Sequence, residues 1–200
     1  MQVIRLNKKT HDGIYQQIAI IHENLLAEGV LAKLGSNFLM KLYKALVNDS
    51  EAAVYVIQEN EKILAFVSCT TNTNNFYKQF IYSNWTSMIL ILPKLCTPIL
   101  LKRSFSLLKY LIKKTDNETP VAELLSIAVA KDAHRVGLGS KLMTKVFDFM
   151  KENHVDSFKV TAALTQKSAH KFYESKGGIS MESIELGKLK SYIYHFTIFR

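Results

Sequence analysis

The chain contains two kinds of apolar sequence pattern, which together predict a mixture of helices and strands. Apolar residues spaced three and four apart indicate a helix with one buried face, and they recur at residues 14–25, 36–47, 138–150 and 166–176. Runs rich in β-branched and aromatic residues predict strands, and these lie at residues 3–6, 53–57, 63–69, 124–129, 157–164, 180–185 and 191–199. The pattern predicts one mixed α/β (α+β) domain over residues 1–200, with a central sheet flanked by helices.

Local signals mark the ends of several of these elements. Ser36 has the side chain of an N-cap and is expected to begin the second helix. The polar residues 59–61 separate two strands and predict an antiparallel hairpin. Gly29 and Gly177 follow helical patterns and are expected to end them.

Residues 72–119 form an unusually long connection between the third and fourth predicted strands. Its apolar run at residues 88–101 is too short to span a bilayer and is interrupted by Pro93, Lys94 and Pro98. We expect an insertion of two or three short helices. Three roles stay open for it: extra core, a lid over a substrate site, or a peripheral membrane contact through the basic and apolar residues 88–114.

Composition narrows the class of partner without choosing one. The chain has 200 residues and a formal net charge of +9, which favours anionic ligands or surfaces. Its two cysteines, Cys69 and Cys96, form neither a disulfide framework nor a metal-binding spacing, so a reducing compartment is expected. The first ten residues lack the apolar core of a signal peptide, which points to a cytoplasmic location.

Residues 124–140 carry the most specific chemical signal in the sequence. An apolar strand at 124–129 leads through a short loop into Gly137-Leu138-Gly139-Ser140, where an amphipathic helix opens. The first backbone N–H groups of a helix have no partner within it, and glycines let a ligand approach them closely. Such a turn is a ready site for a phosphate group, although the spacing is neither a dinucleotide fingerprint nor a P-loop.

The segment His134-Arg135-Val136-Gly137-Leu138-Gly139 resembles the acyl-CoA loop of the GNAT N-acetyltransferases, Gln/Arg-x-x-Gly-x-Gly/Ala. His134 stands where Gln or Arg is usual, and the neighbouring Arg135 offers the missing charge. A second segment, residues 166–178, resembles the other motif of this family, Asn-x-x-Ala-x-x-Phe/Leu-Tyr-x-x-x-Gly-Phe. It matches at Ala169, Phe172, Tyr173 and Gly177 and departs at Gln166 and Gly178.

The resemblance implies a GNAT-like fold, with a mostly antiparallel mixed sheet and the helical insertion of residues 72–119. It implies acetyl-CoA as the acyl donor and transfer of the acetyl group to a primary amine. In the family the fourth strand separates from the fifth and the pantetheine arm lies between them. The residues it implies for binding acetyl-CoA are Ile127, Val129, His134, Arg135, Val136, Gly137, Leu138, Gly139, Ser140 and Gln166.

Two residues are candidates for catalysis. The amine must lose a proton to attack a thioester, and Glu123 at the start of the fourth strand is the first candidate for the base. Its side chain is expected to share a face with Ile127 and Val129 unless a bulge intervenes. Tyr173 occupies the family position that often protonates the departing thiolate. The alternative for Tyr173 is a core aromatic beside Phe172.

The sequence leaves the acceptor open. An amino sugar of surface polysaccharide assembly and a protein amine are both candidates, because the insertion is large enough to shape a site for a bulky acceptor. A non-catalytic module that binds CoA, another anion or nucleic acid is the alternative. No nucleic acid is expected, because the basic stretch 102–114 has aromatic and leucine residues that look buried. A homodimer is left open.

Overall fold

The computed structural model describes residues 1–29, 31–84, 120–133, 136–186 and 189–198. Seven strands form a single sheet in the order β1-β2-β3-β4-β5-β7-β6. Neighbouring strands are antiparallel except β4 and β5, which are parallel. The strands are Val3–Arg5 (β1), Ala52–Glu59 (β2), Lys62–Thr70 (β3), Glu123–Val129 (β4), Ser157–Ala163 (β5), Ile179–Leu186 (β6) and Leu189–Thr197 (β7).

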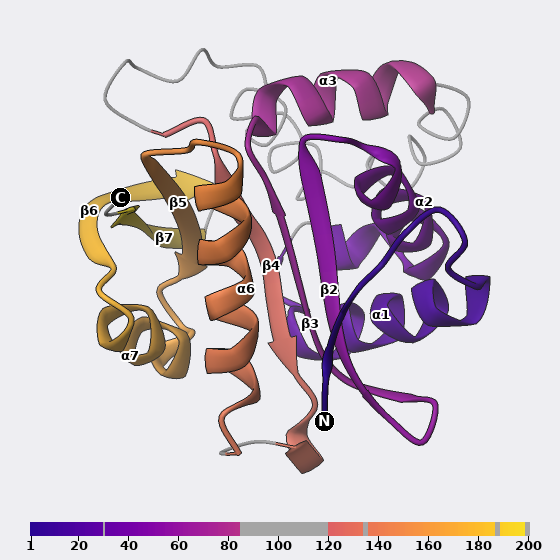
Figure 1. Cartoon of the computed structure of the whole chain (residues 1–200). Helices are drawn as coiled ribbons and strands as arrows, with labels where there is room; N and C mark the ends of the chain where they lie inside the picture. The colour runs from indigo at the N-terminus through magenta and orange to yellow at the C-terminus, as the bar shows by residue number, and fades with distance from the viewer. Residues whose placement is uncertain (30, 85–119, 134–135, 187–188, 199–200) are drawn as a thin grey trace.

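Helices cover both faces of this sheet (Figure 1). The helix α6 packs on one face, where its buried residues join those of α7 and of strands β2 to β5 and β7 in one core cluster. The helices α1, α2 and α3 contribute to a second cluster on the opposite face. Their bounds are Asp12–Leu25 (α1), Ser36–Asn48 (α2), Thr73–Ser83 (α3), Leu138–Glu152 (α6) and Lys167–Ser175 (α7), with 3-10 turns at Leu31–Leu34 and Lys131–Ala133.

The predicted fold class is confirmed, and most of the expected elements appear within one or two residues of their predicted ends. The expected cap at Ser36 is wrong. Gly35, with φ of 89°, is the N-cap of α2 and offers no side-chain hydrogen bond, while Ser36 is the first helical residue. In the hairpin between β2 and β3, Asn60 and Glu61 both have positive φ, 46° and 64°, as a tight turn of primed type requires.

The predicted insertion begins with α3, which lies between β3 and β4 in the chain and packs against α2 (Figure 1). Residues 85–119 lie outside the described part of the chain, so the expected further helices, the lid and the membrane contact through residues 88–114 stay predictions. Cys96 lies there too, whereas Cys69 is buried on β3. None of the helices that the structure describes is long and apolar enough to cross a membrane.

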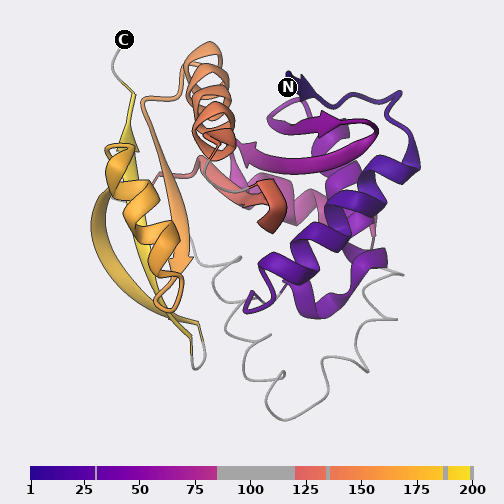
Figure 2. The same cartoon turned by 90° about the horizontal axis from the view of Figure 1, so that it is seen from below.

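The parallel pair β4 and β5 is joined only at its beginning. Glu123 pairs with Lys159 and Leu124 pairs with Val160, and the pairing stops there. The two halves of the sheet then diverge, so that α7, β6 and β7 stand on one side and α1 and α2 on the other (Figure 2). The edge of β4 that faces β5 is therefore not covered by that strand beyond Leu124.

Candidate active site

A cleft of about 210 Å³ opens where β4 and β5 diverge. Residues of β4 and β5 form two of its walls, and the end of α1 with the following loop forms a third. Tyr173 of α7 and Ser191 of β7 complete it. Its lining comprises His22, Leu26, Glu28, Gly29, Leu31, Leu124, Leu125, Ser126, Ile127, Val160, Thr161, Ala163, Gln166, Tyr173 and Ser191.

A bulge in β4 sets which side chains face this cleft. Opposite β3, Ser68 pairs with Ser126 and Cys69 pairs with Leu124, so Leu125 is the extra residue. A bulge of one residue reverses the side-chain alternation beyond it. Leu124, Ile127 and Val129 consequently pack with the α6 cluster, whereas Leu125 packs with the α1 and α2 cluster.

The bulge overturns the expected orientation of Glu123. As the neighbour of Leu124, Glu123 lies on the face opposite Ile127 and Val129, and it does not line the cleft. The residue is 6% exposed. Burial raises the pKa of its carboxyl, while the Lys159 charge and the Thr73 and Thr161 hydroxyls act in the opposite direction. Thr161, whose hydroxyl is among the groups that lower the pKa of this carboxyl, also lines the cleft.

The start of α6 has the features of an anion site. Gly137 is its N-cap in the left-handed region, with φ of 78°, and no side chain among the described residues caps the helix. Val136 precedes it and is exposed, Leu138 is buried, and Ser140 is half-buried. The N–H groups of the first helical turn, including those of Gly139 and Ser140, are thus available to phosphate oxygens. His134 and Arg135 lie outside the described residues.

The tertiary structure brings the two sequence motifs into contact. A Cβ added at Gly139 would lie 3.4 Å from Cε2 of Phe172 on α7 and 3.9 Å from Cγ2 of Val129 on β4. The start of α6 therefore lies within van der Waals reach of α7 and of the end of β4. Gln166, which precedes α7, lines the cleft and accepts a hydrogen bond from the Ala163 N–H at 3.2 Å through Oε1.

Tyr173 belongs both to the core and to the cleft. It is 5% exposed and its ring packs against those of Phe172, Tyr194 and Phe196. Burial and the neighbouring Tyr194 raise the pKa of its phenol, so that the hydroxyl keeps its proton at neutral pH. No hydrogen bond from another described residue engages that hydroxyl, which leaves it available to a bound ligand.

His22 lines the cleft, although no motif in the sequence singles it out. It is 3% exposed on α1, and its Nδ1 lies 2.6 Å from the Tyr43 hydroxyl. The only sequence signal is a histidine close to the buried stripe of an amphipathic helix, which is usually a core residue. Its place in the cleft depends on how α1 packs over β3 and β4.

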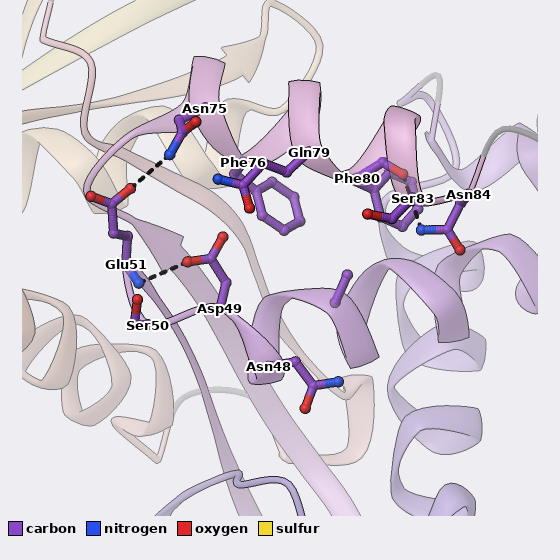
Figure 3. A pocket seen from close by; sticks show the side chains of 11 residues that line it. Asn48, Asp49, Ser50, Glu51, Asn75, Phe76, Gln79, Phe80, Ser83 and Asn84 are labelled. Atoms are coloured by element: carbon purple, nitrogen blue, oxygen red, sulfur yellow. Dashed lines mark hydrogen bonds between the residues drawn. The ribbon is translucent and has the colours of Figure 1, made fainter.

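A larger hollow of about 520 Å³ lies away from this chemistry, between α3 and the turn from α2 to β2 (Figure 3). Its polar lining is held internally: Glu51 accepts a hydrogen bond from Asn75 Nδ2 at 3.2 Å, and Asp49 accepts one from the Glu51 N–H at 2.8 Å. It contains neither a glycine-rich helix start nor a positioned proton donor, and Asn84 at its rim directly precedes residues 85–119. The β4–β5 cleft is therefore the stronger candidate for a functional site.

Comparison with known proteins agrees with this geometry. The family model described as Acetyltransferase (GNAT) family matches residues 23–178. The chain belongs to this acetyltransferase family. It is accordingly an acetyl-CoA-dependent N-acetyltransferase that acts on an amine acceptor, and the family suggested by the two sequence motifs is confirmed. No curated protein sequence matches the chain at a significant level.

Solved structures of acetyltransferases share the fold at low sequence identity. An N-acetyltransferase from Staphylococcus aureus Mu50 superposes with a TM-score of 0.63 at 15% identity, covering 98% of this chain and 100% of its own. Arabidopsis thaliana NAA60, solved in complex with a bisubstrate analogue, gives 0.58 at 12% identity and 98% coverage of both chains. A Bacillus anthracis protein described as a streptothricin acetyltransferase, solved with acetyl coenzyme A, gives 0.50 at 15% identity, covering 78% of this chain and 67% of its own.

Proposed function

We propose that this acetyltransferase moves the acetyl group to a primary amine bound in the β4–β5 cleft. The observation that carries the proposal is the separation of the two strands after Leu124, which exposes the edge of β4 to a ligand beside the Tyr173 hydroxyl. An extended amide chain such as pantetheine is the kind of ligand that an uncovered strand edge can bind through main-chain hydrogen bonds.

The residues proposed for acetyl-CoA follow from this placement. The pyrophosphate lies at the first turn of α6, on the N–H groups of residues 137–140, where the helix dipole favours negative charge. Ile127 and Val129 flank the pantetheine arm from β4, and Gln166 borders the arm at the start of α7. Val136 and Leu138 belong to the turn itself. His134 and Arg135, which lie outside the described residues, are assigned to the cofactor from the sequence motif alone.

The reaction requires one proton acceptor and one proton donor. The amine nitrogen bonds to the thioester carbon, the carbonyl oxygen takes the negative charge, and the tetrahedral intermediate then expels sulfur. We assign the donor role to Tyr173, whose protonated phenol lines the cleft. Glu123 is the proposed final acceptor of the amine proton, which reaches it through the Thr161 hydroxyl because the carboxyl itself does not line the cleft.

The acceptor class we propose is an amino sugar of surface polysaccharide assembly, with a protein amine as the second candidate. The long segment 72–119 favours an acceptor bulkier than a small polyamine. At the cleft, Glu28 carries a carboxylate that accepts a hydrogen bond from the Thr165 hydroxyl. A carboxylate in the lining of a molecule with a net charge of +9 gives an incoming ammonium a local attraction.

Thiol release from acetyl-CoA across a panel of amines tests this proposal. The panel holds amino sugars, peptides with a free N-terminus, lysine and polyamines, and each is measured with and without protein. Release that depends on an amino sugar supports the proposed acceptor, and preference for peptides selects the second candidate. Absence of amine-dependent release throughout the panel, with CoA still bound, would favour the non-catalytic alternative.

A further inference from the structure

His22 is held in the cleft by a buried chain of polar groups. Its Nδ1 lies 2.6 Å from the hydroxyl of Tyr43, which is fully buried on α2. Tyr43 also hydrogen-bonds with Ser126 of β4, which lines the cleft. The imidazole further stacks on Phe66 of β3, with ring centroids 6.4 Å apart and an interplanar angle of 19°. The ring therefore has one fixed orientation.

The imidazole is neutral in this environment. Burial lowers the pKa of His22 to about 4, and no carboxylate of the described residues forms an ion pair with it. The Nδ1 nitrogen forms a hydrogen bond with the Tyr43 hydroxyl. The Nε2 nitrogen has no hydrogen bond with any other described residue. A neutral imidazole with one nitrogen held and the other available can accept a hydrogen bond from a ligand, provided that the proton is on Nδ1.

A neutral group suits the proton transfer itself. The Glu28 carboxylate, which also lines the cleft, attracts the ammonium form of the substrate, and that form must lose a proton before its lone pair can attack. An uncharged imidazole in a desolvated cleft favours the neutral amine instead. His22 lines the cleft on its α1 side, whereas Tyr173 lines it from α7.

We propose that His22 binds the acceptor nitrogen through Nε2 and is the first acceptor of its proton. The inference rests on the function proposed above and adds a catalytic residue to it. Nδ1–H donates to the Tyr43 oxygen, and the Tyr43 hydroxyl donates to Ser126. Tyr43 and Ser126 are thus positioning residues that fix the tautomer.

The step balances in atoms and charge. The lone pair of the neutral amine forms the C–N bond, the nitrogen becomes positively charged, and one N–H proton moves to Nε2 of His22. The C–S bond then breaks, and the thiolate takes a proton from Tyr173. One proton lost by the amine equals one gained by the thiol. Exchange with Glu123 through Thr161, or with solvent, restores His22 and Tyr173.

The tautomer gives a test that does not depend on turnover. Nitrogen-15 NMR of the wild-type protein at neutral pH distinguishes the two neutral forms of each histidine. We expect the His22 signal to show the Nδ1–H form, and Tyr43→Phe to shift the population toward the other. A dominant Nε2–H form in the wild type would overturn the proposal, because Nε2 would then have no lone pair for the amine.

Kinetics of matched variants give the second test. For His22→Gln we expect kcat/KM for the amine to fall by about 10²-fold or more, while acetyl-CoA still raises the melting temperature as in the wild type. His11→Gln makes the same substitution at the N-cap of α1, outside the cleft, and should leave kcat/KM unchanged. Tyr43→Phe keeps the aromatic ring at position 43 and removes the hydroxyl that holds the His22 imidazole. We expect kcat/KM for the amine to fall by about tenfold in this variant.

The outcomes of these experiments distinguish a failure of the His22 role from a failure of the proposed function. Turnover by His22→Gln within about threefold of the wild type would overturn the role of His22 and leave the proposed function intact. If His22→Gln does not fold, an unchanged kcat/KM in Tyr43→Phe overturns the inference instead. A wild-type protein inactive toward every amine would refute the proposed function, and the inference would fail with it.

Discussion

At the scale of single residues, burial decides the chemistry of the site. The phenol of Tyr173, the carboxyl of Glu123 and the imidazole of His22 are all removed from water, and removal from water disfavours the charged form of each. The pKa is raised for the two acids and lowered for the base. Burial therefore shifts the protonation equilibrium of all three groups toward their uncharged forms.

Replacing Tyr173 with Phe tests its role as proton donor. The change removes one hydroxyl and keeps the ring that packs against Phe172, Tyr194 and Phe196. Positioned proton transfer contributes about 10²- to 10⁴-fold in rate, so kcat should fall by that order while CoA affinity and melting temperature change little. Steady-state kinetics measure kcat, and thermal melts with and without CoA measure the stability and the effect of the ligand. A fall of less than about threefold, with chemistry rate-limiting, would remove Tyr173 from the mechanism.

Glu123→Gln separates a catalytic carboxyl from a structural one. A carboxyl whose folded pKa is raised favours folding below its unfolded pKa, and this contribution is lost as pH rises through the folded pKa. At a pH above the folded pKa, the glutamine amide of the variant avoids the cost of burying the Glu123 charge. The free energy of unfolding of the variant should therefore equal or exceed that of the wild type, while kcat decreases. Denaturant melts at pH 5 and pH 8, paired with kinetics, test this. A variant that is both unstable and fully active contradicts the proposal.

His22 predicts a specific loss of stability in acid. Its folded pKa of about 4 lies below the unfolded value of 6.5, so its stabilising contribution is complete above pH 6.5 and is lost as pH falls toward 4. A difference of 2.5 units corresponds to about 3 kcal/mol at 1.36 kcal/mol per unit. Relative to His22→Gln, the wild type should lose stability over this range. Parallel denaturation curves for the two proteins would argue against a buried neutral ring.

At the scale of elements, the start of α6 carries the proposed pyrophosphate site. Gly137 adopts φ of 78° with open space around it, so the conformation of the turn, and not crowding, requires glycine there. Left-handed backbone is strained for most side chains, and most of all for β-branched ones. Gly139 differs from Gly137, because a Cβ added there would make ordinary van der Waals contacts with Phe172 and Val129.

Gly137→Val should therefore disturb the anion site more than the fold. A ligand present at 100 times its Kd stabilises the native state by about 2.7 kcal/mol, and this increase with CoA should disappear in the variant. Gly35→Val is a control at another helix start, because Gly35 is the N-cap of α2 with φ of 89° and ψ of 163°. It should lose stability, since that conformation is essentially confined to glycine, and keep the CoA effect. An unchanged CoA effect in Gly137→Val would refute the site.

At the scale of the whole molecule, charge and sheet geometry act together. The net charge of +9 attracts a polyanionic cofactor from a distance. The sheet is continuous where β4 and β5 pair, as far as Leu124 and Val160, and it divides into two halves beyond these residues. The cleft exists because β5 pairs with β7 along its whole length but with β4 only at its start.

The affinity for acetyl-CoA should depend on salt. Between about 0.1 M and 1 M ionic strength the Debye length falls from about 10 Å to about 3 Å, so attraction between the net charge and the phosphates is largely screened. We expect Kd to rise several-fold across this range in calorimetric titrations, with the melting temperature of the free protein as a control. A constant Kd would mean that the main-chain contacts account for nearly all of the affinity.

The sequence by itself determined the fold class, the family and the two motifs. Apolar periodicity and glycine placement are local properties, because a helix face, a strand or a phosphate-binding turn is specified by neighbours in the chain. This is why the element at residues 138–150 and the strand at 124–129 were predicted nearly as observed. The local pattern failed for the cap of α2, because Gly35 with its positive φ is the N-cap and Ser36 is the first helical residue.

Only the tertiary structure decided which side chains meet in the cleft. The bulge at Leu125 arises from pairing with β3 and turns Glu123 away from Ile127 and Val129, so one residue of register changed the face of the candidate base. His22 enters the cleft through the packing of α1, and Gly139 meets Phe172 through the packing of α6 and α7. These contacts join residues far apart in the sequence, and no local pattern encodes them.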